Sequence, residues 1–583
     1  EIIDENTVTD QGLFDVHKVD EKFYFEINDS LLNREFLMVT RIVKMAREIP
    51  LSRHKMSEQV LRWEKFNGKI LLREASYSVF ASDSLPMREA VSNSNFEPII
   101  ASFSIEAKNK SKNSLLIDVT ELFERDVKSF GFPQSSRKTY NLSSLDTKLS
   151  FIESIRSFPL NVESRHIKTY RSSNTKNGVV SMVLNNSMIL LPKVPMKRRY
   201  FDQRVGWFTT SQTDYGIDNQ EAETVKYLDR WRLEVRDEDI ENFKNGELVE
   251  PKKPIVYYLD RGTPKKWKKY IKQGIEDWQA AFEEAGFKNA IIAKDPPTKE
   301  EDPDWSAEDI RYSVVRYLAS PSLNANGPHV SDPRSGEIIE SDINWYHNVM
   351  KLLRNWYFVQ TAAVNPKARS TEFEEEVMGQ LIRFVSAHEV GHTIGLPHNM
   401  GSSSAYPVDS LRSSSFTKKY GTAPSVMDYA RFNYVAQPED ENVVLTPSEW
   451  ESPNVGVYDK FAVKWGYKPI LDVSQDEEMK ILKSWIIEKE NDMMYRFGSA
   501  GIDPSSQTED LGDDAIKASE YGIKNLKRII PKLKDWTTED GETYDELNYM
   551  YGQVLSQFRR YMGHVTNNIG GVYQYYKTAD QKG

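Results

Sequence analysis

The stretch "SAHEVGHTIGLPHN" (residues 386–399) contains three of the nine histidines in this chain of 583 residues. His388 and His392 are four residues apart, so in a helix both imidazoles lie on one face, one turn from each other. Two ring nitrogens placed in this way can bind one metal ion. Glu389 lies about 100° around the helix from His388, which puts it beside such an ion rather than on it. This position suits a general base that takes a proton from a metal-activated water molecule.

The residues after this helix supply a third nitrogen. Gly395 ends the helix, and the chain then turns so that His398 can return to the same metal ion. Three protein ligands leave one tetrahedral position open for water. Imidazole ligands suit zinc best, and the chain has no cysteine at all. The pattern His-Glu-x-x-His often occurs by chance, but the added glycine and third histidine make it far more restrictive.

These residues carry a family resemblance. The set that resembles the metzincin zinc signature and its Met-turn is His388, Glu389, His392, Gly395, His398 and Met427. The resemblance implies a zinc-dependent endopeptidase in which the three histidines are ligands, Glu389 is the base and Met427 is an apolar floor below the metal. Tyr429 matches a tyrosine that stabilises the oxyanion in two metzincin branches. Four further stretches resemble large secreted bacterial metzincins with N-terminal domains of unknown function: "GLFDVHKV", "KFYFEINDSLL", "DPRSGEII" and "TEDLGDD".

Residues 1–250 are predicted to be β-rich, with residues 1–50 as a candidate small separate unit. Short β-branched or aromatic runs alternate with turn residues, which is typical of antiparallel sheets in a sandwich or an open barrel. The predicted strands are "KFYFEI", "REFLMVTRIV", "GKILLREAS", "PIIASFSIEA", "NSLLIDV" and "VVSMVLNNSMILLP". We interpret the region as a permanent accessory domain rather than a removable inhibitory segment, because it is long and its pattern indicates independent folding.

The pattern changes after the charged linker "NGELVEPKKP" (residues 245–254). A strand, a long helix and further strands predict an α+β catalytic domain over residues 252–470. In the metzincin order, "GEIIESDINW" (residues 336–345) is the edge strand that pairs with a substrate backbone. Residues 471–583 show helical spacing and form a predicted helical extension. The expected architecture is therefore multidomain, from a β-rich region through a metzincin-like domain to helices.

Two features near the site leave alternatives open. The acidic stretch "DPSSQTEDLGDD" (residues 503–514) is interpreted as a solvated loop, and the alternative is a structural calcium site. Arg431 lies in the loop after the Met-turn, which is expected to form a wall of the substrate pocket. It is either a surface arginine or a residue that selects an acidic side chain.

Composition limits the classes of partner. The net charge is −11 and no long basic cluster exists, which argues against nucleic acid as a main partner. No apolar run is long enough for a transmembrane helix. The first residues show no signal segment, so the protein is either cytosolic or has had a signal segment removed. We expect the second case, with the protein secreted, periplasmic or on a bacterial cell surface. The expected partner is a protein or peptide substrate. A zinc amidase acting on a non-protein amide such as cell-wall peptide, and an inactive zinc-binding scaffold, remain as alternatives. The sequence does not indicate an oligomeric state.

Overall fold

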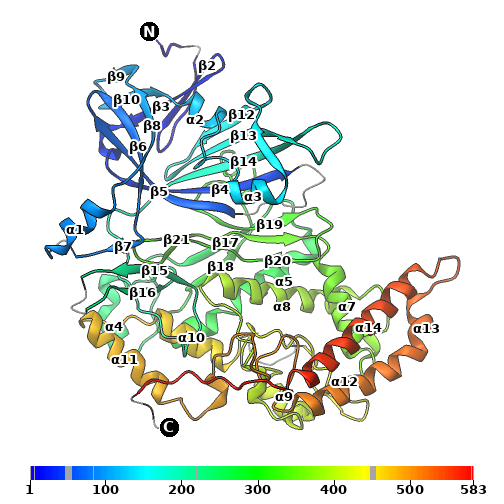
Figure 1. The fold of residues 1–583 in the computed structure, drawn as a ribbon. Helices are drawn as coiled ribbons and strands as arrows, with labels where there is room; N and C mark the ends of the chain where they lie inside the picture. The colour runs from blue at the N-terminus through cyan, green and yellow to red at the C-terminus, as the bar shows by residue number, and fades with distance from the viewer. Residues whose placement is uncertain are drawn as a thin grey trace.

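The molecule has a β-rich upper part and a mainly helical lower part, with a parallel sheet between them (Figure 1). The computed structural model describes residues 2–5, 7–45, 55–82, 84–216, 220–446, 455–579 and 581. This arrangement confirms the predicted multidomain fold class.

Two antiparallel sheets form the β-rich part. The first has the order β1 (Val8–Asp10), β2 (Asp15–Val19), β3 (Lys22–Asn28), β10 (Ser114–Asp118) and β9 (Ala107–Asn109). The second has the order β11 (Leu142–Leu145), β13 (Asn161–Ser172), β14 (Val179–Leu190), β4 (Glu35–Met45), β5 (Lys55–Phe66), β6 (Lys69–Ala75) and β8 (Ile99–Ser104), and β12 (Phe151–Ser157) also pairs with β13. All six strands predicted above are present.

The two sheets enclose one aromatic core. Phe14 and Phe25 come from the first sheet and its connections, and Trp63 comes from the second. Their rings meet at centroid distances of 5.3 Å (Phe14 to Phe25) and 6.4 Å (Phe25 to Trp63). Strands β3 and β4 both precede residue 50, yet they pair with β10 and with β5 and β14. The first 45 residues are therefore built into the same two sheets as the following residues.

Residues 193–249 connect the β-rich part to the sheet of the predicted catalytic domain, which we call the catalytic sheet. They contain β15 (Thr209–Asp214) and β16 (Glu223–Leu228), which pair with each other, and β15 also pairs with β7 (Val79–Phe80). The short helix α4 (Ile240–Lys244) precedes the catalytic sheet. Val205, Trp207 and Leu228 of this segment are buried in the same core as the catalytic helices. The core of the lower part therefore begins well before residue 250, and the domain boundaries themselves stay a prediction.

The catalytic sheet has the order β18 (Ile291–Lys294), β17 (Ile255–Leu259), β19 (Ser313–Leu318), β23 (Ile343–Tyr346) and β20 (Ala325–Asn326). The first four are parallel, and β20 is antiparallel to β23. The helices of this part are α5 (Lys265–Glu276), α6 (Gln279–Glu284), α7 (Val349–Thr361) and α8 (Glu375–Thr393). In Figure 1, α5 and α8 lie together below the sheet.

The predicted edge strand is wrong. "GEIIESDINW" forms two strands, β22 (Glu337–Glu340), which pairs with β21 (Val330–Asp332), and β23, which lies inside the sheet. Strand β23 pairs with β19 on one side and β20 on the other, and all four of its residues are buried. The edge strand is β20, whose two residues are too few to give a periodic pattern. Acidic residues of this stretch form ion pairs within the fold, for example Asp342 with Arg316.

The C-terminal part is helical, as predicted. Its helices are α10 (Val457–Tyr467), α11 (Gln475–Ile487), α12 (Ala515–Ile529), α13 (Leu533–Thr537) and α14 (Asp545–Thr566). The remaining short helices are α1 (Met87–Ser94), α2 (Thr120–Glu124), α3 (Gln134–Thr139) and α9 (Ser414–Tyr420). Among the described residues, we find no helix that combines the length and apolar character needed to cross a bilayer.

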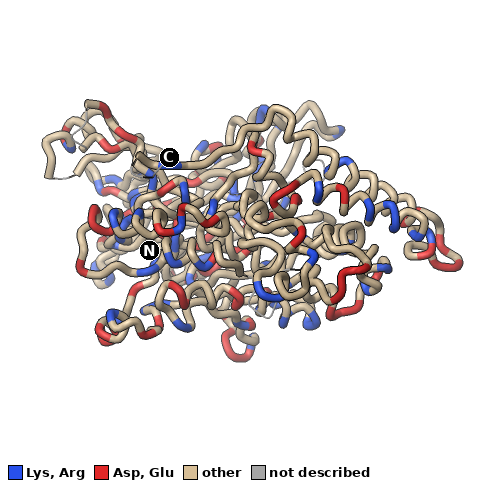
Figure 2. Tube along the Cα trace, turned by 90° about the horizontal axis from the view of Figure 1, so that it is seen from below, with Lys and Arg blue, Asp and Glu red and all other residues tan. Residues whose placement is uncertain are grey.

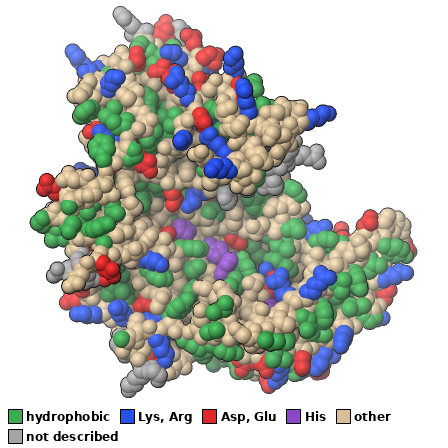
Figure 3. Space-filling view, in the orientation of Figure 1, with side chains coloured by type: hydrophobic (Ala, Val, Ile, Leu, Met, Phe, Trp, Pro, Cys, Tyr) green, Lys and Arg blue, Asp and Glu red, His purple; other side chains and the backbone are tan. Residues whose placement is uncertain are grey.

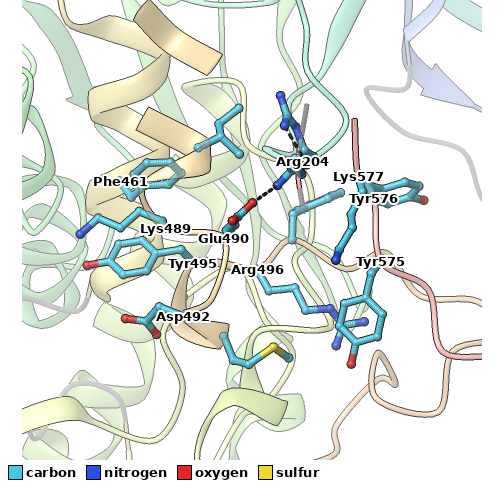
Figure 4. A pocket seen from close by; sticks show the side chains of 14 residues that line it. Arg204, Phe461, Lys489, Glu490, Asp492, Tyr495, Arg496, Tyr575, Tyr576 and Lys577 are labelled. Atoms are coloured by element: carbon cyan, nitrogen blue, oxygen red, sulfur yellow. Dashed lines mark hydrogen bonds between the residues drawn. The ribbon is translucent and has the colours of Figure 1, made fainter. Parts of the chain in front are cut away.

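The last residues run back across the lower part as an extended tail (Figure 1). The tail closes one side of a cavity of about 100 Å³ whose other walls include Phe461 and Glu490 (Figure 4). Arg204 donates hydrogen bonds to Thr578 Oγ1 at 2.8 Å and to Gln581 Oε1 at 2.9 Å. The tail is thus tied to the same segment that joins the β-rich part to the catalytic sheet.

Candidate metal centre

Helix α8 carries the first two histidines and packs closely on α5. A side chain at Gly274 of α5 would meet the carbonyl oxygen of Arg383 and the side chain of Ser386, so this glycine sets the close approach of the two helices. Trp278 Nε1 donates to the carbonyl oxygen of Ala387 at 2.7 Å. The neighbouring His388 and Glu389 are therefore held on a rigid, buried helix.

Gly395 ends α8 as predicted, in a left-handed conformation with φ of 107°. The turn brings His398 back to the helix. His398 Nε2 lies 3.0 Å from His392 Nε2 and 3.2 Å from His388 Nε2. Among the described residues, these three histidines are the only group of three or more side chains able to hold a metal ion.

The imidazole orientations fit a cation. His388 Nδ1 donates to the carbonyl oxygen of Val426 at 2.7 Å, and His392 Nδ1 donates to that of Leu396 at 2.8 Å. A carbonyl can only accept, so in both rings Nε2 carries the lone pair. The lone pairs of these two nitrogens point toward Nε2 of His398, so three imidazole nitrogens meet at one place where a cation can bind them. The donor set consists of neutral nitrogens, which suits zinc.

Electrostatics keep the three rings neutral. Burial and the neighbouring imidazoles lower the pKa of His388 well below its usual value and that of His392 to about 3. Burial and the charge of Arg431 lower the pKa of His398 to about 4. Near pH 7 all three imidazoles are therefore neutral, with one ring nitrogen free to bind a metal ion.

Met427 lies against helix α8, next to the residue whose carbonyl oxygen contacts His388. It is fully buried, and a side chain at Gly391, between Glu389 and His392 on α8, would overlap its sulfur. The preceding residue, Val426, holds His388 through its carbonyl oxygen. The Met-turn therefore both supports the helix and orients a ligand.

Glu389 lies beside the histidines on the side of the edge strand. Its side chain is buried, and burial raises the pKa of its carboxyl to about 8. A hydrogen bond from the backbone N–H of Gly327, next to β20, offsets part of this rise. The carboxyl thus lies beside the histidines and is hydrogen-bonded to the residue that follows the edge strand β20.

Tyr429 lies against the histidine rings. Its ring centroid is 4.3 Å from that of His398 and 5.1 Å from that of His388. Burial raises the pKa of its phenol, so the hydroxyl stays protonated near pH 7 and can donate a hydrogen bond. The structure thus brings together all seven residues that the sequence assigned to the site, with Gly395 as the end of the helix.

Residues 370–583 match the family model described as Met-zincin, and the match includes every residue of the site. This part of the chain is a Met-zincin. Residues 1–45 and 54–236 match two domains of unknown function, DUF5118 and DUF5117. Neither a search of curated proteins nor a search of solved structures gave a significant match.

The acidic stretch of the Met-zincin domain is not a solvated loop, and the alternative of a structural calcium site stays a prediction. Asp503 and Glu509 are buried and paired with arginines, Asp503 with Arg496 at 2.6 Å and Glu509 with Arg431 at 2.7 Å. Asp514 caps α12 by accepting hydrogen bonds from two backbone N–H groups. The sequence could not show this because the arginine partners lie elsewhere in the chain.

Arg431 is not on the surface. Its side chain is buried, and its guanidinium lies over the ring of Trp356 on α7 and 4.8 Å from the ring of Tyr429. Its charge is shared with Glu509. The surface interpretation of this arginine is therefore wrong.

Two aromatic side chains near the Met-zincin site were not anticipated. The Phe208 ring lies 5.9 Å from that of His392 and 5.2 Å from that of His329, and Phe208 N donates to the carbonyl oxygen of Gly395 at 2.8 Å. His329 in turn contacts Asp229 at 3.1 Å. Neither residue belongs to a sequence motif. Each is part of the site only because the fold brings it close to the histidines.

The centre is accessible. His392 and His398 are only partly buried, and histidine side chains are visible at the bottom of a hollow below the β-rich part (Figure 3). On the face seen from below, basic and acidic residues are interspersed rather than gathered into a basic stripe (Figure 2). The hollow offers a polypeptide access to the histidines.

Proposed function

We propose that the chain is a zinc-dependent endopeptidase. The observation that carries the proposal is the convergence of three Nε2 atoms, 3.0 and 3.2 Å apart around His398, beside a buried glutamate and an open hollow. His388, His392 and His398 would hold the ion. Zinc bound there would acidify a water molecule and polarise a carbonyl oxygen.

The chain's own residues would supply the other steps. Glu389 would take the proton from the attacking water and deliver it to the leaving amine nitrogen, since it is the carboxyl next to the ligands. Tyr429 would donate its phenol hydrogen to the oxygen that becomes negatively charged. Met427 would act only as an apolar floor.

The edge strand favours a peptide over another amide. Strand β20 is at the end of the catalytic sheet and antiparallel to β23, and Gly327 connects it to Glu389. An extended peptide can pair with such an edge through backbone hydrogen bonds, whereas a small amide cannot. A secreted location fits this function and is also a proposal.

The test of this function is hydrolysis of an unfolded protein by the purified chain loaded with zinc. We expect turnover by the parent, loss of at least about 10³ in kcat for Glu389→Gln, and unchanged zinc content. Glu375→Gln is the matched control, since Glu375 is an exposed glutamate in the first turn of the same helix. It should retain parental activity.

Three outcomes would contradict the proposal in different ways. Parental activity in Glu389→Gln would refute the role of the glutamate. Hydrolysis of peptidoglycan fragments but of no protein would identify a non-protein amidase. A zinc-loaded parent with no turnover on either substrate class would indicate an inactive scaffold.

The metal assignment has its own measurement. We expect one zinc per chain, removed by chelators and absent from a variant carrying both His388→Ala and His392→Ala. Stoichiometric zinc in that variant would place the metal elsewhere. Metal analysis of the folded protein decides this without reference to activity.

A further inference from the structure

Arg431 links the catalytic tyrosine to a distant part of the chain. Its guanidinium lies between Trp356 of α7 and the ring of Tyr429, and its Nε is 2.7 Å from Glu509 Oε1. Glu509 lies in the segment between α11 and α12, 78 residues further along the chain than Arg431. The ring of Tyr429 thus contacts an ion pair that joins two segments distant in the sequence.

The environment of this ion pair makes it rigid. The side chains of Arg431 and Glu509 are 9% and 3% exposed, so water competes little for either charge. The other carboxylate oxygen of Glu509 is 3.1 Å from Arg560 Nε on α14. Two guanidinium groups therefore share one carboxylate, and losing that carboxylate would leave two like charges close together.

The backbone at both partners is strained. Arg431 has φ of 54° and Glu509 has φ of 66°, values that side chains other than asparagine and aspartate rarely adopt. Such strain persists only where surrounding contacts determine the conformation, and it is common at functional sites. Here the contacts that fix both residues also fix the ring beside His398.

We propose that Glu509, through Arg431, positions the Tyr429 phenol beside the three histidines, so that the loop at residues 498–513 completes the active site. Arg431 and Glu509 are positioning residues, because neither needs to touch the substrate. The kinetic consequence rests on the proposed peptidase function, but the placement of the ring does not.

The central experiment compares Glu509→Gln with Asp503→Asn. Asp503 is a matched control, because it lies in the same loop, is equally buried and forms an ion pair of 2.6 Å with Arg496 rather than with Arg431. We expect Glu509→Gln to lower kcat about tenfold, with KM within about twofold and full zinc content. Asp503→Asn should lower Tm by a similar amount but leave kcat within about twofold. Glu509→Asp should restore part of the lost kcat.

A double-mutant cycle identifies the route of the effect. If Glu509 acts through the phenol, Glu509→Gln should change kcat less than about twofold in a Tyr429→Phe background. An equal loss in both backgrounds, or an equal loss of kcat in Asp503→Asn, would overturn the proposal and leave a purely structural role.

A spectroscopic measurement tests the placement independently of activity. In protein labelled with fluorotyrosine, the Tyr429 resonance is assigned by its loss in Tyr429→Phe. We expect this ¹⁹F resonance to shift in Glu509→Gln but not in Asp503→Asn. An unshifted resonance would refute the proposal, even if the chain proved inactive as a peptidase. A parent without turnover combined with a shifted resonance would refute the proposed function alone.

Discussion

Residues 8–191 and residues 193–249 both precede the catalytic sheet, but they contact it with different chemistry. The first region uses ion pairs, such as Arg41 with Glu340 at 2.6 Å and Arg165 with Glu308 at 2.8 Å. Its apolar contact is a small cluster in which Val330 of the catalytic part meets residues of β4, β5, β6 and β14. This region resembles a folded unit docked on another unit.

The second region is built into the catalytic core. Val205, Trp207, Leu228, Leu233 and Val235 are buried together with the catalytic helices. The Trp207 ring lies 5.6 Å from that of Tyr467 of α10. We therefore propose that the catalytic unit begins near residue 193, inside the segment that matches DUF5117, and not near residue 250. The four predictions below test this difference, from the largest expected effect to the smallest.

Shortening the chain should have the largest effect. A chain that begins at Lys252 would expose the catalytic core where Trp207 and Leu228 now pack, and we expect it to be insoluble or unfolded. A chain that begins at Lys193 should fold and bind zinc. Circular dichroism, thermal unfolding and metal analysis of both chains provide the measurement. Cooperative unfolding and high activity of the chain from Lys252 would instead support an inhibitory N-terminal region.

Trp207→Ala should be more damaging than a change at the docking contact. Removing a large buried aromatic side chain costs about 3–5 kcal/mol of folding free energy. Glu308→Gln removes one charge from the docking contact but keeps its size, so we expect a smaller loss of stability. Calorimetric melting of both variants gives the comparison. Equal losses of Tm would mean that the two contacts do not differ as proposed.

Gly395→Ala tests the approach of the second region to the metal centre. The glycine has positive φ, and a side chain there would overlap the carbonyl oxygen of Asp229 and contact Trp207. We expect a loss of about 2–3 kcal/mol and weaker zinc binding. Gly246→Ala is the control, since Gly246 also has positive φ but no atoms near its missing side chain, so only about 1 kcal/mol is expected. Similar losses would show that the backbone conformation alone matters.

The last prediction concerns a single proton, through the pH dependence of the docking contact. Burial and the nearby charge of Glu308 raise the pKa of Glu163 to about 7. The folded state therefore binds a proton more tightly than the unfolded state, and stability should fall as pH rises from about 4.5 to about 7, and remain lower above that. Glu163→Gln should flatten this part of the profile of Tm against pH. An unchanged profile would refute the assignment.

Prediction from the sequence succeeded where the pattern is local. The spacing of His388 and His392 fixes their common helical face, and Gly395 marks the helix end by its conformational freedom. The strands of the β-rich part were also recognisable from alternating residues. The edge strand β20 was missed because a strand of two residues is too short to show a periodic pattern. Strand β23 was misplaced because its own sequence does not show which strands lie beside it.

The sequence by itself determined the chemistry of the centre, since a helix of any protein places residues four apart on one side. Tertiary structure alone decided what surrounds that centre. It placed Met427 below Gly391, Trp207 against Gly395 and Glu509 behind Arg431. These partners are separated by 36 to 188 residues along the chain, and each contact depends on how whole elements pack rather than on local spacing. The acidic stretch interpreted as a solvated loop and the arginine interpreted as a surface residue therefore meet in one buried ion pair, Glu509 with Arg431.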